Sequence, residues 1–141
     1  MIEILNQQKR YEIDTDRLQH LLEDLIRFYQ IPDPEVTLAL VNDRPMADLN
    51  LRYMAKDGPT DVLSFPIRDT GPDGKYYLGD IIISVPYAAR QSRSLGHELQ
   101  RELEILVIHG LLHLKGFEHS EGLEEEEEKT RARWLKESHE L

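Results

Sequence analysis

Residues 98–119 read ELQRELEILVIHGLLHLKGFEH, and the predicted architecture is built around this segment. Between residues 103 and 114, apolar side chains cover nearly every side of the helix that the pattern predicts. A helix that is apolar all round lies in the interior of a protein. Gly116 favours the left-handed conformation that commonly ends a helix. We therefore expect a central, buried helix over residues 98–114.

Three of the six histidines fall inside this stretch. His109 and His113 are four residues apart, so their imidazoles lie on one helical face. A bend at Gly116 allows His119 to supply a third nitrogen. Three imidazoles around one Zn²⁺ leave a fourth position for water, which is typical of catalytic zinc, although they also suit nickel, copper or iron. We predict that His109, His113 and His119 hold one Zn²⁺ per chain with a catalytic water, and the sequence leaves the general base and any further catalytic residue unassigned. The other histidines lack this spacing and are interpreted as structural: His20, His97 and His139.

The same run resembles the zinc signature of metzincin proteases, H-E-x-x-H-x-x-G-x-x-H. The position of the general-base glutamate in those proteases is Gly110 here, and Glu118 follows the bend instead. Without that carboxylate, the base that activates the zinc-bound water is missing, so peptide hydrolysis is disfavoured. A glycine inside a helix costs about 1 kcal/mol relative to alanine. Gly110 therefore indicates a need for close packing or for substrate access.

The rest of the chain predicts strands and helices in alternation, followed by helices alone. Periodicity and turn residues predict strands over residues 2–5, 36–41, 60–65 and 78–84, the third ended by Pro66, with a turn over 68–75. They predict helices over residues 15–29, 43–53, 85–95, 98–114 and 122–138. The fold class is therefore α+β: a mixed sheet of about four strands covered by about five helices, with the central buried helix carrying the metal site.

Composition predicts one domain over residues 1–141, with 40% hydrophobic residues and no cysteine. The first residues lack the features of a signal peptide and no apolar run is long enough to span a bilayer, so we expect a cytoplasmic protein without membrane contact. Taken alone, the net charge of −10 argues against nucleic-acid binding. Much of it lies in Glu121 and residues 124–128, which we interpret as a solvated helix face, so charge alone leaves the substrate open.

Two blocks of sequence point to a known family. The run from His109 to His119 fits the pattern H-G-x-L-H-L-x-G-Y-D-H. Upstream, residues 49–50, 56–57, 59–66 and 78–81 read LN, KD, PTDVLSFP and LGDI and fit a second block. In both blocks, in their order and in length, the chain resembles the YbeY-type rRNA maturation endoribonucleases.

This resemblance implies a single-strand-specific, metal-dependent endoribonuclease that acts in 3′-end maturation of small-subunit (16S-type) ribosomal RNA and in ribosome quality control. The implied partners are single-stranded RNA and the ribosomal small subunit or its proteins. The family's zinc ligands map onto His109, His113 and His119. The chain departs from the family pattern at three positions: Phe117 replaces tyrosine, Glu118 replaces aspartate, and Met54 replaces an arginine.

A nuclease also needs positive charge near the phosphate that develops negative charge. Arg52, Lys56 and Arg90 are candidate substrate-binding residues, and Arg52 or Lys56 is the candidate replacement for the arginine missing at Met54. A cation in such a position is more often an ordinary surface charge. Asp80 is a candidate acceptor for the second ring nitrogen of a metal-binding histidine, although a strand-end aspartate with a local hydrogen bond has the same sequence pattern.

Three functions remain open on the residues alone. The first is metal-assisted phosphodiester cleavage, in which the metal polarises a phosphoryl oxygen or activates water. The second is a non-catalytic ribosome assembly factor with a structural zinc. The third is a hydrolase for another substrate, because only the resemblance specifies RNA.

Overall fold

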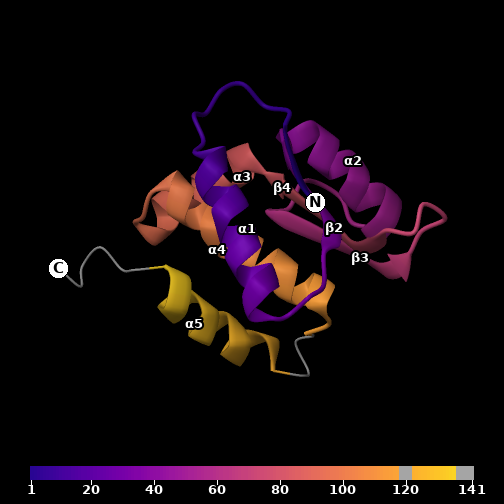
Figure 1. The fold of residues 1–141 in the computed structure, drawn as a ribbon. Helices are drawn as coiled ribbons and strands as arrows, with labels where there is room; N and C mark the ends of the chain where they lie inside the picture. The colour runs from indigo at the N-terminus through magenta and orange to yellow at the C-terminus, as the bar shows by residue number, and fades with distance from the viewer. Residues whose placement is uncertain (118–121, 136–141) are drawn as a thin grey trace.

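The computed structural model describes residues 1–117 and 122–135. The strands are β1 (Ile2–Asn6), β2 (Pro34–Val41), β3 (Val62–Thr70) and β4 (Tyr76–Ser84). The helices are α1 (Thr15–Phe28), α2 (Asp43–Met54), α3 (Val85–Leu95), α4 (Leu99–Lys115) and α5 (Leu123–Trp134), and Figure 1 shows them arranged around the sheet. None of the described helices combines the length and the apolar composition needed to cross a membrane.

The four strands form one mixed sheet in the order β1-β2-β4-β3. The pairs β1–β2 and β2–β4 are parallel, and β3 runs antiparallel to β4. The parallel pairs need crossover connections, which α1, α2 and the β3 hairpin provide. The predicted α+β class, with four strands and five helices in the described ranges, is confirmed.

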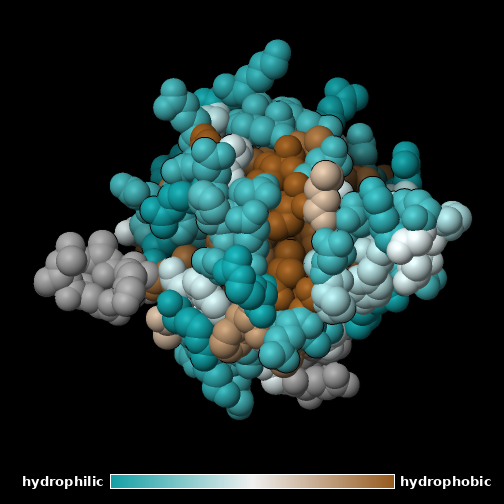
Figure 2. Space-filling model, in the orientation of Figure 1, coloured by the Kyte–Doolittle hydropathy of each residue, from teal (hydrophilic) through white to brown (hydrophobic). Residues whose placement is uncertain are grey.

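The two faces of the sheet are covered by different helices. Leu38 and Ile81 belong to the main core, together with buried residues of α1 and α4. Their neighbours Ala39 and Ile82 belong to a second cluster, which Met46 of α2 completes. Successive residues of a strand point to opposite faces, so α2 covers the face opposite to α1 and α4. Most of the surface in Figure 2 is hydrophilic, with a strip of hydrophobic side chains beside α1.

The central helix α4 is buried as its sequence predicts. Leu103, Val107, Ile108, Leu111 and Leu114 are all fully buried. Burial of each such side chain contributes about 1.5–3 kcal/mol relative to leaving it exposed. This helix crosses the sheet face against β3 and β4 and contacts α1, α3 and α5, so residues at its end are held by all of these elements.

Two glycines fix the position and the end of α4. A Cβ atom on Gly110 would lie 2.7 Å from Cγ2 of Ile81, so the helix approaches β4 more closely than any larger residue allows. Of the two needs predicted for Gly110, close packing is the one that this contact meets. Gly116 has φ 118° and caps the helix, and its backbone N–H donates to the carbonyl oxygens of Leu112 and His113. The predicted helix end at Gly116 is confirmed.

The hairpin of β3 and β4 is longer than predicted. The prediction that Pro66 ends β3 is wrong, because the strand continues to Thr70 and the turn is correspondingly shorter. β3 is an edge strand, where a proline is tolerated because its missing N–H need not join a ladder. The pairing shifts register between Pro66 and Asp69, and Arg68 has a φ of 50°. Helix α5 begins at Leu123, and residues 136–138 of its predicted range lie outside the described residues.

Candidate metal centre and cavity

His109 and His113 lie in the last two turns of α4, on one face as their spacing predicts. Their ring centroids are 4.9 Å apart. His119, the third predicted ligand, lies outside the described residues, as do Glu118 and His139. Within the described part of the chain, no group of three or more histidine, cysteine or acidic side chains is placed to hold a metal ion. The predicted three-histidine site therefore stays a prediction, with two of its members on one helical face.

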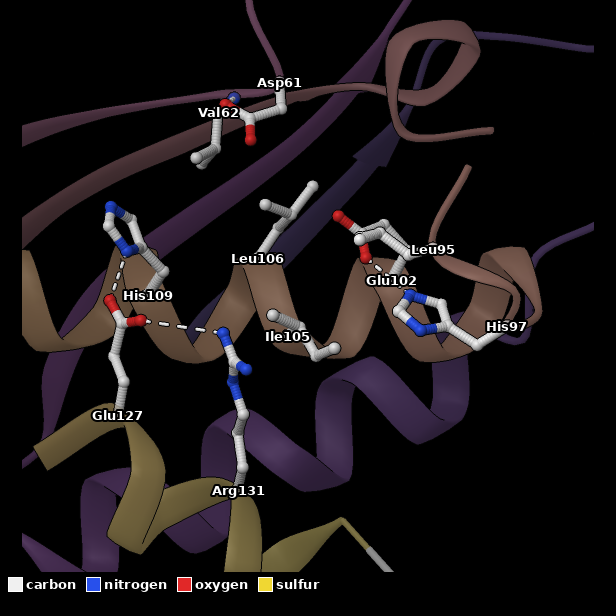
Figure 3. A pocket seen from close by; sticks show the side chains of 10 residues that line it. All are labelled: Asp61, Val62, Leu95, His97, Glu102, Ile105, Leu106, His109, Glu127 and Arg131. Atoms are coloured by element: carbon white, nitrogen blue, oxygen red, sulfur yellow. Dashed lines mark hydrogen bonds and ion pairs between the residues drawn. The ribbon is translucent and has the colours of Figure 1, made fainter. Parts of the chain in front are cut away.

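A cavity of about 500 Å³ runs along α4 (Figure 3). His109 lies at one end of the cavity and His97 at the other, with Ile105 and Leu106 between them. Its other walls come from Val62 at the start of β3, from the end of α3 and from α5. The walls mix apolar side chains with charged and polar ones, among them Asp61, which lies along the wall between the two histidines. Concave sites that combine apolar walls with convergent polar groups are typical of ligand binding.

At the His109 end, α5 contributes an acidic side chain. The Glu127 carboxylate contacts Nδ1 of His109 through Oε1, and Oε2 lies 3.7 Å from the Arg131 guanidinium. The interpretation of residues 124–128 as a solvated face is therefore wrong for this residue. It is also wrong for Glu126, which accepts a hydrogen bond from the Tyr29 hydroxyl. Glu124, Glu125 and Glu128 are exposed, as predicted.

At the other end, His97 belongs to a polar network rather than standing alone. Its Nε2 lies 2.6 Å from Oε1 of Glu102, a carboxylate that is almost completely buried. The Gln91 amide donates to the other oxygen of Glu102, at 2.8 Å, and to the Asp61 carboxylate, at 3.2 Å. The sequence predicted only a structural role for His97 and did not predict that His97 lines the cavity.

Sequence reasoning also missed Glu102, Asp61 and Glu127. Glu102 precedes His109 by seven residues, which is two helical turns, so its spacing puts it on the same face of α4. That signal was present in the sequence. Asp61 immediately precedes β3 and Glu127 lies on α5, so both reach the cavity only through the packing of β3 and α5 against α4.

The predicted substrate-binding cations do not line the cavity. Arg90 on α3 forms an ion pair with Asp43, at 2.9 Å. Burial of Asp43 opposes its ionisation, but hydrogen bonds from Arg90 and Ser84 outweigh burial and lower the pKa of that carboxyl. Arg52 lies in α2, and Lys56 lies in the segment that follows α2. Helix α2 covers the face of the sheet opposite to α4, and Arg52 lies over the Tyr53 ring.

Asp80 also lies away from the histidines. It pairs with Phe65 across β3 and β4, and Phe65 packs against the cluster of α2. Its neighbour Ile81 faces Gly110 of α4, so Asp80 points to the opposite face. Burial raises the pKa of Asp80, and a hydrogen bond with Thr37 partly offsets this effect. The structure therefore places Asp80 apart from the predicted ligands.

Comparison with known proteins decides the family. The family model described as endoribonuclease YbeY matches residues 3–138. This chain belongs to the YbeY endoribonuclease family. The resemblance inferred from the two sequence blocks is thereby confirmed.

Individual members of the family match over most of the chain. The endoribonuclease YbeY of Moorella thermoacetica is 43% identical over 132 residues, which covers 82% of each chain. That of Syntrophotalea carbinolica is 36% identical and covers 94% of this chain and 90% of its own. The solution structure of TM1509 from Thermotoga maritima has a TM-score of 0.62 at 27% identity and covers 95% of this chain and 91% of its own. The α+β fold is thus shared with a solved structure.

Proposed function

We propose that this chain is a zinc-dependent, single-strand-specific endoribonuclease of the cytoplasm. Its substrate would be small-subunit (16S-type) ribosomal RNA, in 3′-end maturation and ribosome quality control, with the small subunit or its proteins as partners. The observation that carries the proposal is the position of His109, one helical turn from His113, at the end of a cavity in a chain of this family.

The residues present fit a zinc ion. His109 and His113 project from one face of α4, and imidazole nitrogen is a preferred zinc ligand. The contact between Glu127 and Nδ1 of His109 is the arrangement that metal-binding histidines usually have, with a carboxylate on the second ring nitrogen. His109, His113 and His119 would hold the metal. When bound, zinc would act as a Lewis acid on the scissile phosphodiester and lower the pKa of water.

The cavity accounts for a preference for single strands. Its mixed polar and apolar walls surround a volume of about 500 Å³. Bases of a duplex are paired and stacked, whereas unpaired nucleotides can be splayed into such a site. Among the described residues that line the cavity, Arg131 is the one cation that stays charged at all physiological pH values, and in this proposal it would contact a phosphate near His109.

The experiment is cleavage of a labelled single-stranded RNA by metal-quantified wild type and by His113→Ala, with circular dichroism to confirm folding of the variant. We expect the wild type to cut, a chelator to stop it, the folded variant to be inactive, and a duplex of the same sequence to resist. Equal cutting by both proteins would point to contamination. If the wild type binds one zinc but neither protein cuts, the result favours the alternative function, an assembly factor with a structural zinc.

A further inference from the structure

We infer that Glu127 is a positioning residue for the metal centre: its carboxylate fixes the tautomer of His109 and thereby the ring nitrogen that binds metal. This inference rests on the proposed zinc site. It implies that α5 contributes to that site through Glu127, one of the acidic residues 124–128.

The contact is specific in its atoms and partly shielded from water. Oε1 of Glu127 meets Nδ1 of His109, while the side chains are 13% and 26% exposed, respectively. The second oxygen, Oε2, faces the Arg131 guanidinium at 3.7 Å, one turn further along α5 (Figure 3). The cation offsets the cost of partly burying the carboxylate. The hydrogen-bond contact at Oε1 and this longer ion pair at Oε2 both favour the orientation in which the carboxylate faces the ring.

The chemistry follows from what each group can donate. An ionised carboxylate only accepts hydrogen bonds, so the proton of a neutral His109 ring must be on Nδ1. The other nitrogen, Nε2, then carries the lone pair that a metal needs. The same hydrogen bond makes the ring a stronger ligand and holds its orientation. Loss of the carboxylate therefore weakens metal binding without removing a ligand.

Helix α5 keeps its position by contacts that do not involve Glu127. Leu123 is fully buried in the main core. The Trp134 ring packs on Phe28 with centroids 5.0 Å apart, and the Tyr29 hydroxyl lies 3.0 Å from Oγ1 of Thr130. A substitution at Glu127 is therefore expected to leave α5 docked.

The test measures zinc affinity by competition with a chromophoric chelator for wild type, Glu127→Ala and Glu127→Gln. The matched control is Glu128→Ala, which removes the neighbouring, exposed carboxylate on the same helix. We expect zinc binding roughly 10- to 100-fold weaker for Glu127→Ala, a smaller loss for Glu127→Gln, whose amide oxygen still accepts, and no change for the control. Circular dichroism checks that each variant is folded.

A second measurement reads the tautomer directly in the metal-free protein. Nitrogen-15 chemical shifts of the His109 ring should show the proton on Nδ1 in wild type and a mixture of tautomers in Glu127→Ala. Unchanged zinc affinity together with an unchanged tautomer would overturn the inference. So would X-ray absorption spectra in which Glu127→Ala loses an oxygen ligand, because Glu127 would then bind the metal itself. If wild type binds no zinc, the proposed function fails, while the tautomer measurement still decides the role of Glu127.

Discussion

Gly110 of α4 packs directly on Ile81 of β4, with room for a hydrogen but not for a methyl group. A Cβ at position 110 would approach Cγ2 of Ile81 to 2.7 Å and Cγ1 to 3.1 Å. The short distance between helix and sheet therefore requires glycine at position 110, directly after the predicted ligand His109. This contact holds the end of α4, and His109 with it, at the cavity.

Gly110→Ala should destabilise the protein by about 1 kcal/mol net. Overpacking a core costs about 1–3 kcal/mol, and the better helix propensity of alanine returns about 1 kcal/mol. In an Ile81→Ala background, where the clash is relieved, the same substitution should instead stabilise. Urea denaturation of the four proteins in this double-mutant cycle measures the coupling. An identical effect of Gly110→Ala in both backgrounds would contradict the packing argument.

Glu102→Ala should destabilise the protein by about 2 kcal/mol or more. The buried carboxylate binds His97 and Gln91, and hydrogen bonds to a charged group are worth about 1.5–3 kcal/mol each. Glu98→Ala, which removes an exposed carboxylate four residues earlier, is the matched control and should stay within about 0.5 kcal/mol of wild type. Thermal unfolding measures both variants, and equal losses in the two would show that the network contributes nothing.

Asp80→Asn should be more stable than wild type at pH 7, with an advantage that disappears in acid. Burial raises the pKa of Asp80, so the folded state disfavours its ionised form. Stability contributed by such a group is fully present below its unfolded pKa and is lost as pH rises through the folded pKa. The free energy of unfolding of both proteins, measured between pH 3 and pH 7, checks this prediction. A constant difference across that range would exclude titration of Asp80 as the cause.

Tyr29 should titrate with a pKa of about 12, because burial and the adjacent Glu126 carboxylate disfavour its phenolate. The raised pKa means that its stabilising effect is present below the unfolded value of about 10 and is lost as pH rises towards 12. Ultraviolet absorbance of phenolate, compared between wild type and Tyr29→Phe, isolates this one group. Titration near pH 10 in the difference spectrum would show that α1 and α5 are not joined by this hydroxyl.

Local sequence predicted the elements well where the physical cause is itself local. The burial of α4 follows from apolar residues on all its sides, and its end follows from Gly116. The prediction at Pro66 was wrong, because whether a proline ends a strand depends on whether the strand lies at an edge of the sheet. The interpretation of His97 was incomplete, since its partner Glu102 is visible as a neighbour only once the turn before α4 is folded.

The family, the α+β class and the common face of His109 and His113 could all be predicted from the amino-acid sequence, because motif spacing and helical periodicity are properties of the chain. Which side chains contact these histidines depends on the three-dimensional packing of the chain. This packing brought Glu127 to His109 across 18 residues, placed Asp61 at the same cavity, and left Arg52, Lys56 and Asp80 away from it. These outcomes depend on which helix covers which face of the sheet, and that is set by the packing of the whole core.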